Sequence, residues 1–148
     1  MNWIVPPQID NRFPGRPFVP WVFAALVAMT LGRSLFHMFA PDGGAQSVAH
    51  IPLDSYPAPA ADAVVFIFAF WGLSQLMMGA VSAIVLARYR SMIPLMLVLI
   101  AAEYAGRMAI GHFRPIVTTA TAPGAILDYV AVPLALLLLY FSRPAAGR

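Results

Sequence analysis

Four long stretches of almost uninterrupted apolar residues dominate this sequence, and short polar segments separate them. They cover roughly residues 18–39, 61–86, 91–112 and 124–142. A helix needs about 20 apolar residues to cross the hydrocarbon core of a bilayer, and each stretch is long enough. The apolar character is continuous and does not alternate, which argues against the strands of a membrane β-barrel. The pattern predicts an all-α integral membrane protein, a bundle of four transmembrane helices.

The remaining segments are two tails and one long loop. Residues 1–17 are rich in proline, which predicts an interfacial tail without regular structure, and residues 143–148 form a short C-terminal tail. The loop of residues 40–60 opens with the turn sequence PDGG and contains several apolar residues. A loop of this length in a compact protein is usually functional or packed, so we expect it to cap the bundle. Residues 18–142 form one domain.

Composition excludes several classes of protein. The chain has 148 residues, of which 61% are hydrophobic and only 10% charged, whereas soluble domains carry about 25% charged residues. Cysteine and lysine are both absent, which excludes thiolate metal sites, a cysteine nucleophile and a Schiff-base lysine. The net charge of +3 does not indicate a nucleic-acid partner, because the arginines stand mostly in pairs beside apolar stretches.

The placement of arginine predicts the orientation of the helices. With four spans, the two tails and the second loop lie on one side of the membrane. That side holds six of the nine arginines, namely Arg12, Arg16, Arg88, Arg90, Arg143 and Arg148. The opposite side holds only Arg114 outside the helices. Since loops rich in arginine stay in the cytoplasm, we expect both termini to be cytoplasmic in a bacterial inner membrane.

Ionisable residues within the apolar stretches are the candidate site residues. They are Arg33, His37, Asp62, Glu103, Arg107 and Asp128. A rise of about 1.5 Å per residue places all of them in the outer part of the bundle. Charged residues inside a span usually face the bundle interior and pair with one another, so we expect one polar cluster. His50, His112 and Arg114 are expected nearby at the outer surface.

Two interpretations of this cluster stay open. The first is an ion-pair network that determines how the helices dock, in which Arg107 clamps Glu103 one turn away. The second is a hydrated site that binds an anion, a metal or a lipid headgroup, or that relays protons. The three histidines lie in different elements and lack the close spacing of known metal motifs, so no metal site is predicted. The sequence requires no cofactor.

Two further features predict contacts between helices. Gln75 lies near the middle of its apolar stretch, where an amide usually hydrogen-bonds to a neighbouring helix. Small residues are spaced four apart at Gly79 and Ala83 and again at Ala102 and Gly106. This spacing allows two helix backbones to approach closely.

The stretch EYAGR, residues 103–107, is similar to the third span of the small bacterial four-helix membrane proteins related to DoxX. The similarity is carried by the pair Gly106-Arg107, by the length of the chain and by the long first outer loop. It implies coverage of about residues 18–142. Some members of that group are subunits of membrane redox complexes that pass electrons to quinone. Thiol chemistry in that group cannot be carried over, because this chain has no cysteine.

No serine-nucleophile elbow, P-loop or dinucleotide fingerprint occurs, so the sequence favours a non-enzymatic role without excluding an enzyme. We expect an accessory or scaffold subunit of a larger membrane complex, or a lipid or hydrophobe binder. Its partners would then be membrane lipids and other membrane subunits or further copies of itself. The alternatives are a redox subunit or enzyme acting on a quinone-like or lipid substrate, and a small transporter that works as an oligomer.

Overall fold

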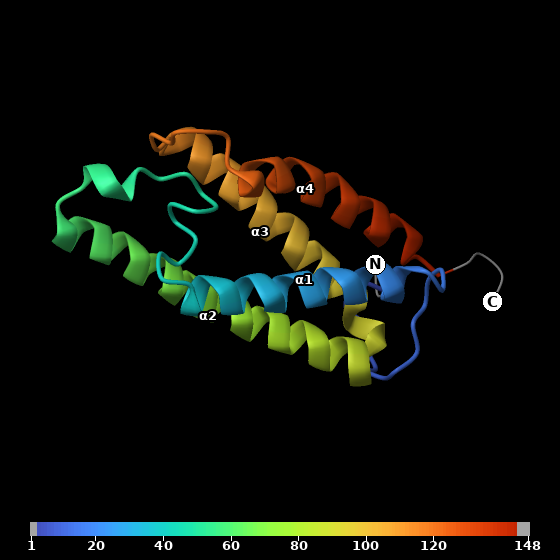
Figure 1. Cartoon of the computed structure of the whole chain (residues 1–148). Coiled ribbons are helices and arrows are strands. Elements are labelled where there is room, and N and C mark those ends of the chain that lie inside the picture. The colour runs from blue at the N-terminus through green and yellow to red at the C-terminus, as the bar shows by residue number, and fades with distance from the viewer. Residues whose placement is uncertain (1–2, 145–148) are drawn as a thin grey trace.

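The computed structural model describes residues 3–144, which form four α-helices and no strand (Figure 1). The helices are α1 (Val19–Phe39), α2 (Ala58–Arg88), α3 (Ile93–Phe113) and α4 (Pro123–Phe141). Two short 3-10 turns, Leu53–Ser55 and Arg90–Met92, precede α2 and α3. The prediction of four helices is confirmed, and every boundary lies within three residues of the predicted one.

Proline determines where each helix begins. Pro20, Pro59, Pro94 and Pro123 occupy the first or second helical position, and none of the four helices has a side-chain cap. Proline is favoured there because its fixed φ suits the helix and because the N–H it lacks would have no partner in the first turn. Within the helices, the hydroxyls of Ser34 and Ser82 donate to carbonyls four residues earlier, which satisfies them inside their own helix.

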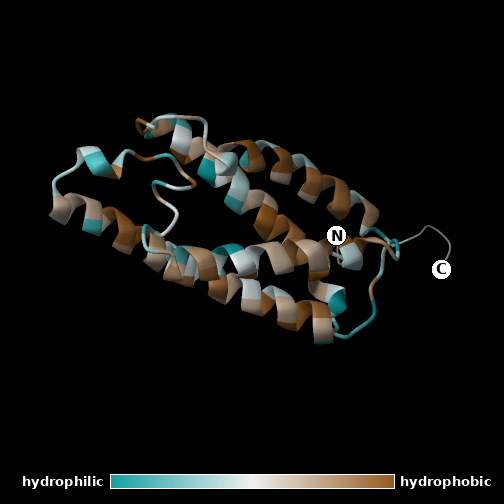
Figure 2. Ribbon diagram, viewed as in Figure 1, coloured by the Kyte–Doolittle hydropathy of each residue, from teal (hydrophilic) through white to brown (hydrophobic). Residues whose placement is uncertain are grey.

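All four helices are long and apolar enough to cross a membrane. Only 17% to 28% of the residues in the most apolar window of each helix are buried, so most apolar side chains face outward. Figure 2 shows hydrophobic residues along most of all four helices, with hydrophilic residues in the loops, at helix ends and at a few positions inside the helices. A helix on the surface of a soluble protein would instead turn a polar face to its surroundings. These features are those of a multi-pass membrane protein.

The helices pack as two pairs, α1 with α2 and α3 with α4. We call the end of the molecule where α1 begins and α4 finishes the terminal end, and the opposite end the loop end (Figure 1). Side chains of all four helices meet in one apolar core toward the terminal end. Its buried members are Val19, Phe23, Val27, Val85, Ile93, Met96, Leu97 and Leu138. This core is closely packed and apolar, and it holds the two pairs together.

The N-terminal tail packs across the terminal end. The backbone N–H of Asp10 donates to the Ser91 hydroxyl at 3.0 Å, and the Ser91 N–H donates back to the Asp10 carbonyl at 3.2 Å. The N–H of Arg16 donates to the carbonyl of Phe141 at 2.9 Å. Gly15 lies so close to α4 that a Cβ there would collide with the Phe141 carbonyl oxygen. The tail thereby links the turn between α2 and α3 to the last turn of α4.

The long loop between α1 and α2 folds over the loop end. Its residues Ala45, Ile51 and Leu53 are buried against α2. The carboxylate of Asp42 accepts hydrogen bonds from three backbone N–H groups at 2.6 to 3.1 Å, those of Gly44, Gln46 and Ser47. These bonds organise the turn that follows α1.

The loop between α3 and α4 is attached to the loop between α1 and α2. The N–H of Thr119 donates to the carbonyl of His50 at 2.9 Å. His50 adopts a positive φ of 58°, an uncommon conformation for a residue other than glycine. The two loops therefore form one cover over the loop end.

The charge of Asp42 stabilises this cover in a pH-dependent manner. Burial by itself raises the pKa of Asp42, but the hydrogen bonds from Ser47, Gly44 and Gln46 outweigh it and leave the pKa below its ordinary value of 3.8. A lowered pKa means that the folded state favours the charged form. The stabilisation is therefore present above pH 3.8 and is lost as the pH falls through the lowered pKa.

We expect Asp42→Asn to lower the melting temperature of the detergent-solubilised protein at pH 6, because the charged hydrogen bonds become weaker neutral ones. The difference from the natural protein should shrink as the pH is lowered below 3.8, where Asp42 itself becomes protonated. Thermal unfolding followed by circular dichroism measures the melting temperatures of the two proteins and how their difference changes with pH. Asp62→Asn serves as the control, since Asp62 is exposed and its carboxylate accepts no hydrogen bond within residues 3–144. A difference that stays constant with pH would contradict this role of Asp42.

Candidate functional site

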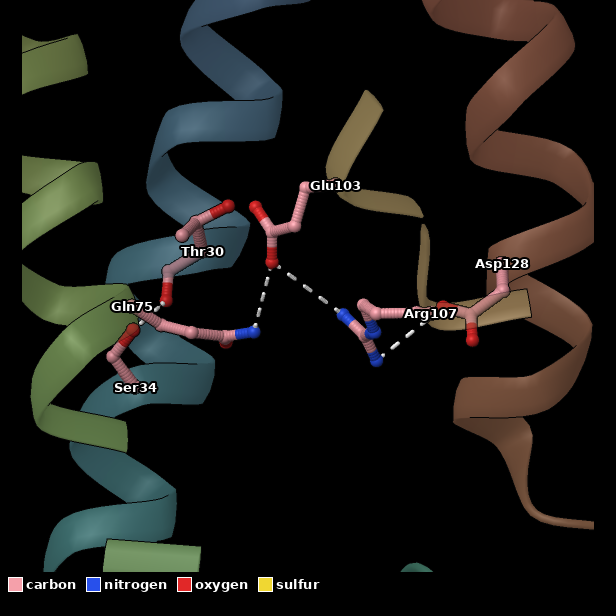
Figure 3. A network of polar contacts seen from close by, with 6 residues as sticks. All are labelled: Thr30, Ser34, Gln75, Glu103, Arg107 and Asp128. Atoms are coloured by element: carbon pink, nitrogen blue, oxygen red, sulfur yellow. Dashed lines mark hydrogen bonds and ion pairs between the residues drawn. The ribbon is translucent and has the colours of Figure 1, made fainter. Parts of the chain in front are cut away.

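Arg107 on α3 is the centre of a polar layer between the two helix pairs (Figure 3). Its Nη2 lies 3.3 Å from Oδ1 of Asp128 on α4, and its Nη1 lies 3.9 Å from Oε1 of Glu103 one turn earlier on α3. Neither contact has the geometry of a hydrogen bond, although both are ion pairs. The side chains of Arg107 and Asp128 are 21% and 14% exposed, so this charge pair is largely shielded from the surroundings. The predicted pairing of Glu103 and Arg107 is present.

Gln75 connects this layer to α2. It is 5% exposed, and its Nε2 donates to Oε1 of Glu103 at 3.4 Å (Figure 3). The expectation that this amide bonds to a neighbouring helix is therefore confirmed. Since Glu103 also pairs with Arg107, one chain of polar contacts runs from α2 through α3 to α4. Interhelical contacts of this kind replace water as hydrogen-bonding partner inside a bilayer.

Two aromatic rings stand beside the arginines of the layer. The guanidinium carbon of Arg107 lies 4.9 Å from the ring centres of both Trp71 and Tyr104. The guanidinium of Arg33 on α1 lies 5.9 Å and 6.0 Å from the same two rings. Cation–π attraction stabilises an arginine at these distances by about 0.5–2 kcal/mol. The rings thus bring Arg33 and Arg107, from different helix pairs, into one environment.

His37 lies next to this layer and supports the loop. It is 5% exposed, and its Nδ1 lies 2.7 Å from the carbonyl oxygen of Gly43. Because a carbonyl can only accept, Nδ1 carries the proton in this contact. The ring packs against Trp71, with 4.8 Å between ring centres, and against Phe68. His37 therefore fastens the turn after α1 to the aromatic residues of α2.

A cavity of about 400 Å³ opens between the two helix pairs beneath the loop. We call it the loop-end cavity. Its polar lining residues are Arg33, His37, Arg107 and Asp128, and its remaining walls are apolar, including Phe36, Val48, Phe68, Trp71 and Leu127. A mostly apolar pocket with a few convergent polar groups is typical of a binding site for a small molecule. A separate enclosed space of about 50 Å³ lies between Arg33, Gln75 and Glu103.

Four buried polar atoms of the layer have no hydrogen-bond partner among the residues that the structure describes. They are Nε of Arg33, Oε1 of Gln75, Nη1 of Arg107 and Oδ1 of Asp128. Such atoms are rare in folded proteins, and they often mark places where water or a ligand binds. All four belong to residues that line the two cavities just described. The layer thus has polar atoms without hydrogen-bond partners beside two cavities that can hold water or a ligand.

The structure brings together most, but not all, of the residues expected in the cluster. Arg33, His37, Arg107 and Asp128 share one cavity, and Glu103 pairs with Arg107. Asp62 lies apart from them: it is exposed on the first turns of α2 and makes no ion pair or side-chain hydrogen bond within residues 3–144. The reason is that α2 begins at Ala58, well beyond the end of α1, so its first turns lie beside the loop and away from α3.

The three residues expected at the outer surface do not contribute side chains to the site. His112 and Arg114 are exposed at the end of α3, and His50 takes part through its backbone carbonyl. Within the described residues no three histidine or acidic side chains lie close enough to hold a metal ion. Trp71 and Tyr104 were not singled out as site residues from the sequence. Their positions one helical turn from Gln75 and Arg107 were the available signal.

Comparison of this chain with family models, with curated proteins and with solved structures finds no match. The similarity to DoxX-related proteins therefore stays a hypothesis that rests on Gly106-Arg107 and on the layout of the chain.

Proposed function

We propose that this protein is a four-helix bundle of the bacterial inner membrane that binds a lipid-like hydrophobe in the loop-end cavity. In this proposal it acts as a non-catalytic accessory subunit, by presenting or retaining its ligand for a larger membrane assembly. The observation that carries the proposal is the loop-end cavity itself, about 400 Å³ in volume, with apolar walls and with charged residues from three helices.

The proposed orientation has both termini in the cytoplasm. The terminal end carries Arg12, Arg16, Arg88, Arg90 and Arg143 among the described residues. The loop end carries Arg114 outside the polar layer, together with Asp42, Asp54 and Asp62. This asymmetry follows the positive-inside rule. The loop-end cavity then opens in the outer half of the bilayer.

The polar layer supports binding more than catalysis. Both of its carboxylates, Glu103 and Asp128, lie in ion pairs with Arg107, so each already has a charged protein partner. The lining of the loop-end cavity contains no serine, threonine or tyrosine hydroxyl that could act as a nucleophile.

The packing also supports binding more than transport. The apolar core toward the terminal end contains Phe23 and Leu97, both fully buried, and it lies between the loop-end cavity and the terminal end. A transport path would have to pass this core, and rearrangement of a close-packed core is costly. A cavity that a packed core separates from the terminal end can hold a hydrophobe but offers no path across the membrane.

Native mass spectrometry of the protein released from mild detergent tests the proposal. We expect the natural protein to retain a lipid-sized ligand and Ala125→Phe to retain at least about fivefold less, because the new ring would occupy the mouth of the loop-end cavity, which Ala125 lines. Ala105→Phe is the matched control, since Ala105 is an exposed alanine on α3 outside that lining. Equal retention by all three proteins, or no retention by the natural one, would overturn the proposal.

A further inference from the structure

The two arginines of the polar layer differ in their ion pairs. Arg107 pairs with both carboxylates, Asp128 at 3.3 Å and Glu103 at 3.9 Å. Arg33 has no carboxylate within 4 Å among the described residues. Yet Arg33 belongs to a helix long and apolar enough to cross a membrane. An arginine in such a helix normally pairs with an acidic side chain.

The surroundings of Arg33 compensate for this only in part. The Trp71 and Tyr104 rings lie 5.9 Å and 6.0 Å from its guanidinium carbon, near the outer limit of cation–π attraction. Its Nε is buried and donates to no acceptor among the described residues. A buried donor without an acceptor is costly, and a charge in an apolar medium without a counter-charge costs more. The positive charge of Arg33 and its Nε–H donor therefore remain available to a ligand.

Water in the 50 Å³ space beside Arg33 could accept its hydrogen bond. A water molecule does not neutralise a charge, however. The acidic residue that lines the same space, Glu103, is already paired with Arg107 and bonded to Gln75. Hydration therefore satisfies the donor but leaves the net charge of the site unchanged.

The charged residues that line the loop-end cavity are mostly basic. Its lining holds two arginines, Arg33 and Arg107, and one carboxylate, that of Asp128. The second carboxylate of the polar layer, Glu103, pairs with Arg107 and lies outside this lining. Asp128 would repel an anion, but its charge is taken up by Arg107 at 3.3 Å. Arg33 reaches the cavity from the opposite helix pair. Arg33 is thus the charged side chain of the lining that has no carboxylate within 4 Å among the described residues.

We infer that the ligand of the loop-end cavity is an anionic amphiphile, whose carboxylate or phosphate group pairs with Arg33 while its apolar chain lies against Phe36, Phe68 and Leu127. This inference rests on the proposed function and adds the charge class of the ligand and the residue that recognises it. The planar guanidinium binds carboxylate and phosphate oxygens through paired hydrogen bonds. A free fatty acid and a lipid with an anionic headgroup share this chemistry.

Trp71 is a built-in reporter for the test, because it lines the cavity and faces both arginines. With Trp3→Phe and Trp21→Phe, Trp71 becomes the only tryptophan of the chain. The protein in neutral detergent micelles is titrated with dibrominated stearic acid at pH 8, with the matching brominated alcohol, and with a phosphatidic acid bearing the same brominated chains. Bromine quenches tryptophan fluorescence only at close range, so quenching reports occupancy of the cavity.

We expect the ionised amphiphiles to quench at about tenfold lower mole fraction than the alcohol, the factor expected of one charge-assisted hydrogen bond. Arg33→Gln should remove this preference, and circular dichroism should show the same helix content and melting temperature as in the parent, so that loss of folding is excluded. Arg33→Lys should keep part of the preference, since the charge remains. Arg114→Gln is the matched control and should behave like the parent, because Arg114 is exposed and lies outside the cavity.

The outcomes separate this inference from the proposed function. Equal quenching by acid and alcohol would overturn the anionic ligand and leave hydrophobe binding standing. No quenching by any of the three would overturn both. A preference that survives Arg33→Gln would overturn the role of Arg33. A stronger effect of stearic acid than of phosphatidic acid identifies a free fatty acid as the ligand, and the reverse identifies a lipid headgroup; either supports the inference.

Discussion

Replacing Arg107 with alanine is expected to lower the free energy of unfolding by about 3 kcal/mol, because removal of one partner strands two carboxylates in an apolar environment. Asp128, whose side chain is 14% exposed, would lose its partner at 3.3 Å, and Glu103 its partner at 3.9 Å. The cation–π contacts with Trp71 and Tyr104 would be lost as well. Unfolding by SDS, followed by circular dichroism in mixed micelles, measures the change.

Arg114→Ala is the matched control for this experiment. Arg114 is an exposed arginine one residue beyond α3, and it makes no ion pair within the described residues. Its replacement should change stability by less than about 0.5 kcal/mol. Equal losses for the two variants would contradict the idea that Arg107 holds the polar layer together.

A double variant separates stranded charge from lost packing. If stranded carboxylates cause the loss, Arg107→Ala combined with Asp128→Asn should be more stable than the sum of the two single changes implies. Simple additivity would mean that the guanidinium acts mainly by filling space between Trp71 and Tyr104.

The second large effect is expected at Gly72, where α2 packs closely against α1 beside the site. A Cβ at this position would lie 2.9 Å from Cβ of His37 and 3.0 Å from the carbonyl oxygen of Ser34. Gly72→Ala should therefore cost about 1–3 kcal/mol through overpacking. The shift should also disturb His37, whose ring holds the carbonyl of Gly43 at 2.7 Å. Faster amide exchange in residues 43–49 would report this.

Gly106→Ala is the control, because a Cβ at Gly106 meets no atom within 4 Å. Both substitutions gain up to about 1 kcal/mol of helix propensity, so the difference between them isolates the steric cost at Gly72. If the two variants were equally stable, the close packing of α1 against α2 at this point would not matter to the fold.

Small residues show which contacts between helices could be predicted from the sequence. The spacing of Gly79 and Ala83 predicted a close contact, and a Cβ at Gly79 would indeed lie 2.8 Å from a methyl carbon of Leu31. The same spacing at Ala102 and Gly106 predicted a contact that is absent among the described residues. Spacing defines which residues share a helix face. It does not say which face another helix covers.

The structure brings most of the predicted cluster residues close together, in an organisation that the sequence did not predict. The i,i+4 relation of Glu103 and Arg107 lies within one helix, so the sequence was sufficient to pair them. That Asp128 completes this pair, whereas Asp62 does not, depends on where α4 and α2 begin relative to α3. The same relation between helices leaves Arg33 without a carboxylate.

The four helices, their limits and the position of the ionisable residues of the spans toward the loop end could be predicted from the sequence, because helix length, proline position and hydropathy act locally along the chain. Three features depend on packing between helices: their arrangement as two pairs, the cavity of about 400 Å³ between the pairs, and the position of Trp71 and Tyr104 beside two arginines. The physical reason is that apolar side chains gain nearly as much from lipid as from a neighbouring helix. Hydrophobicity therefore specifies which segments enter the membrane, and close packing with polar contacts specifies which faces meet.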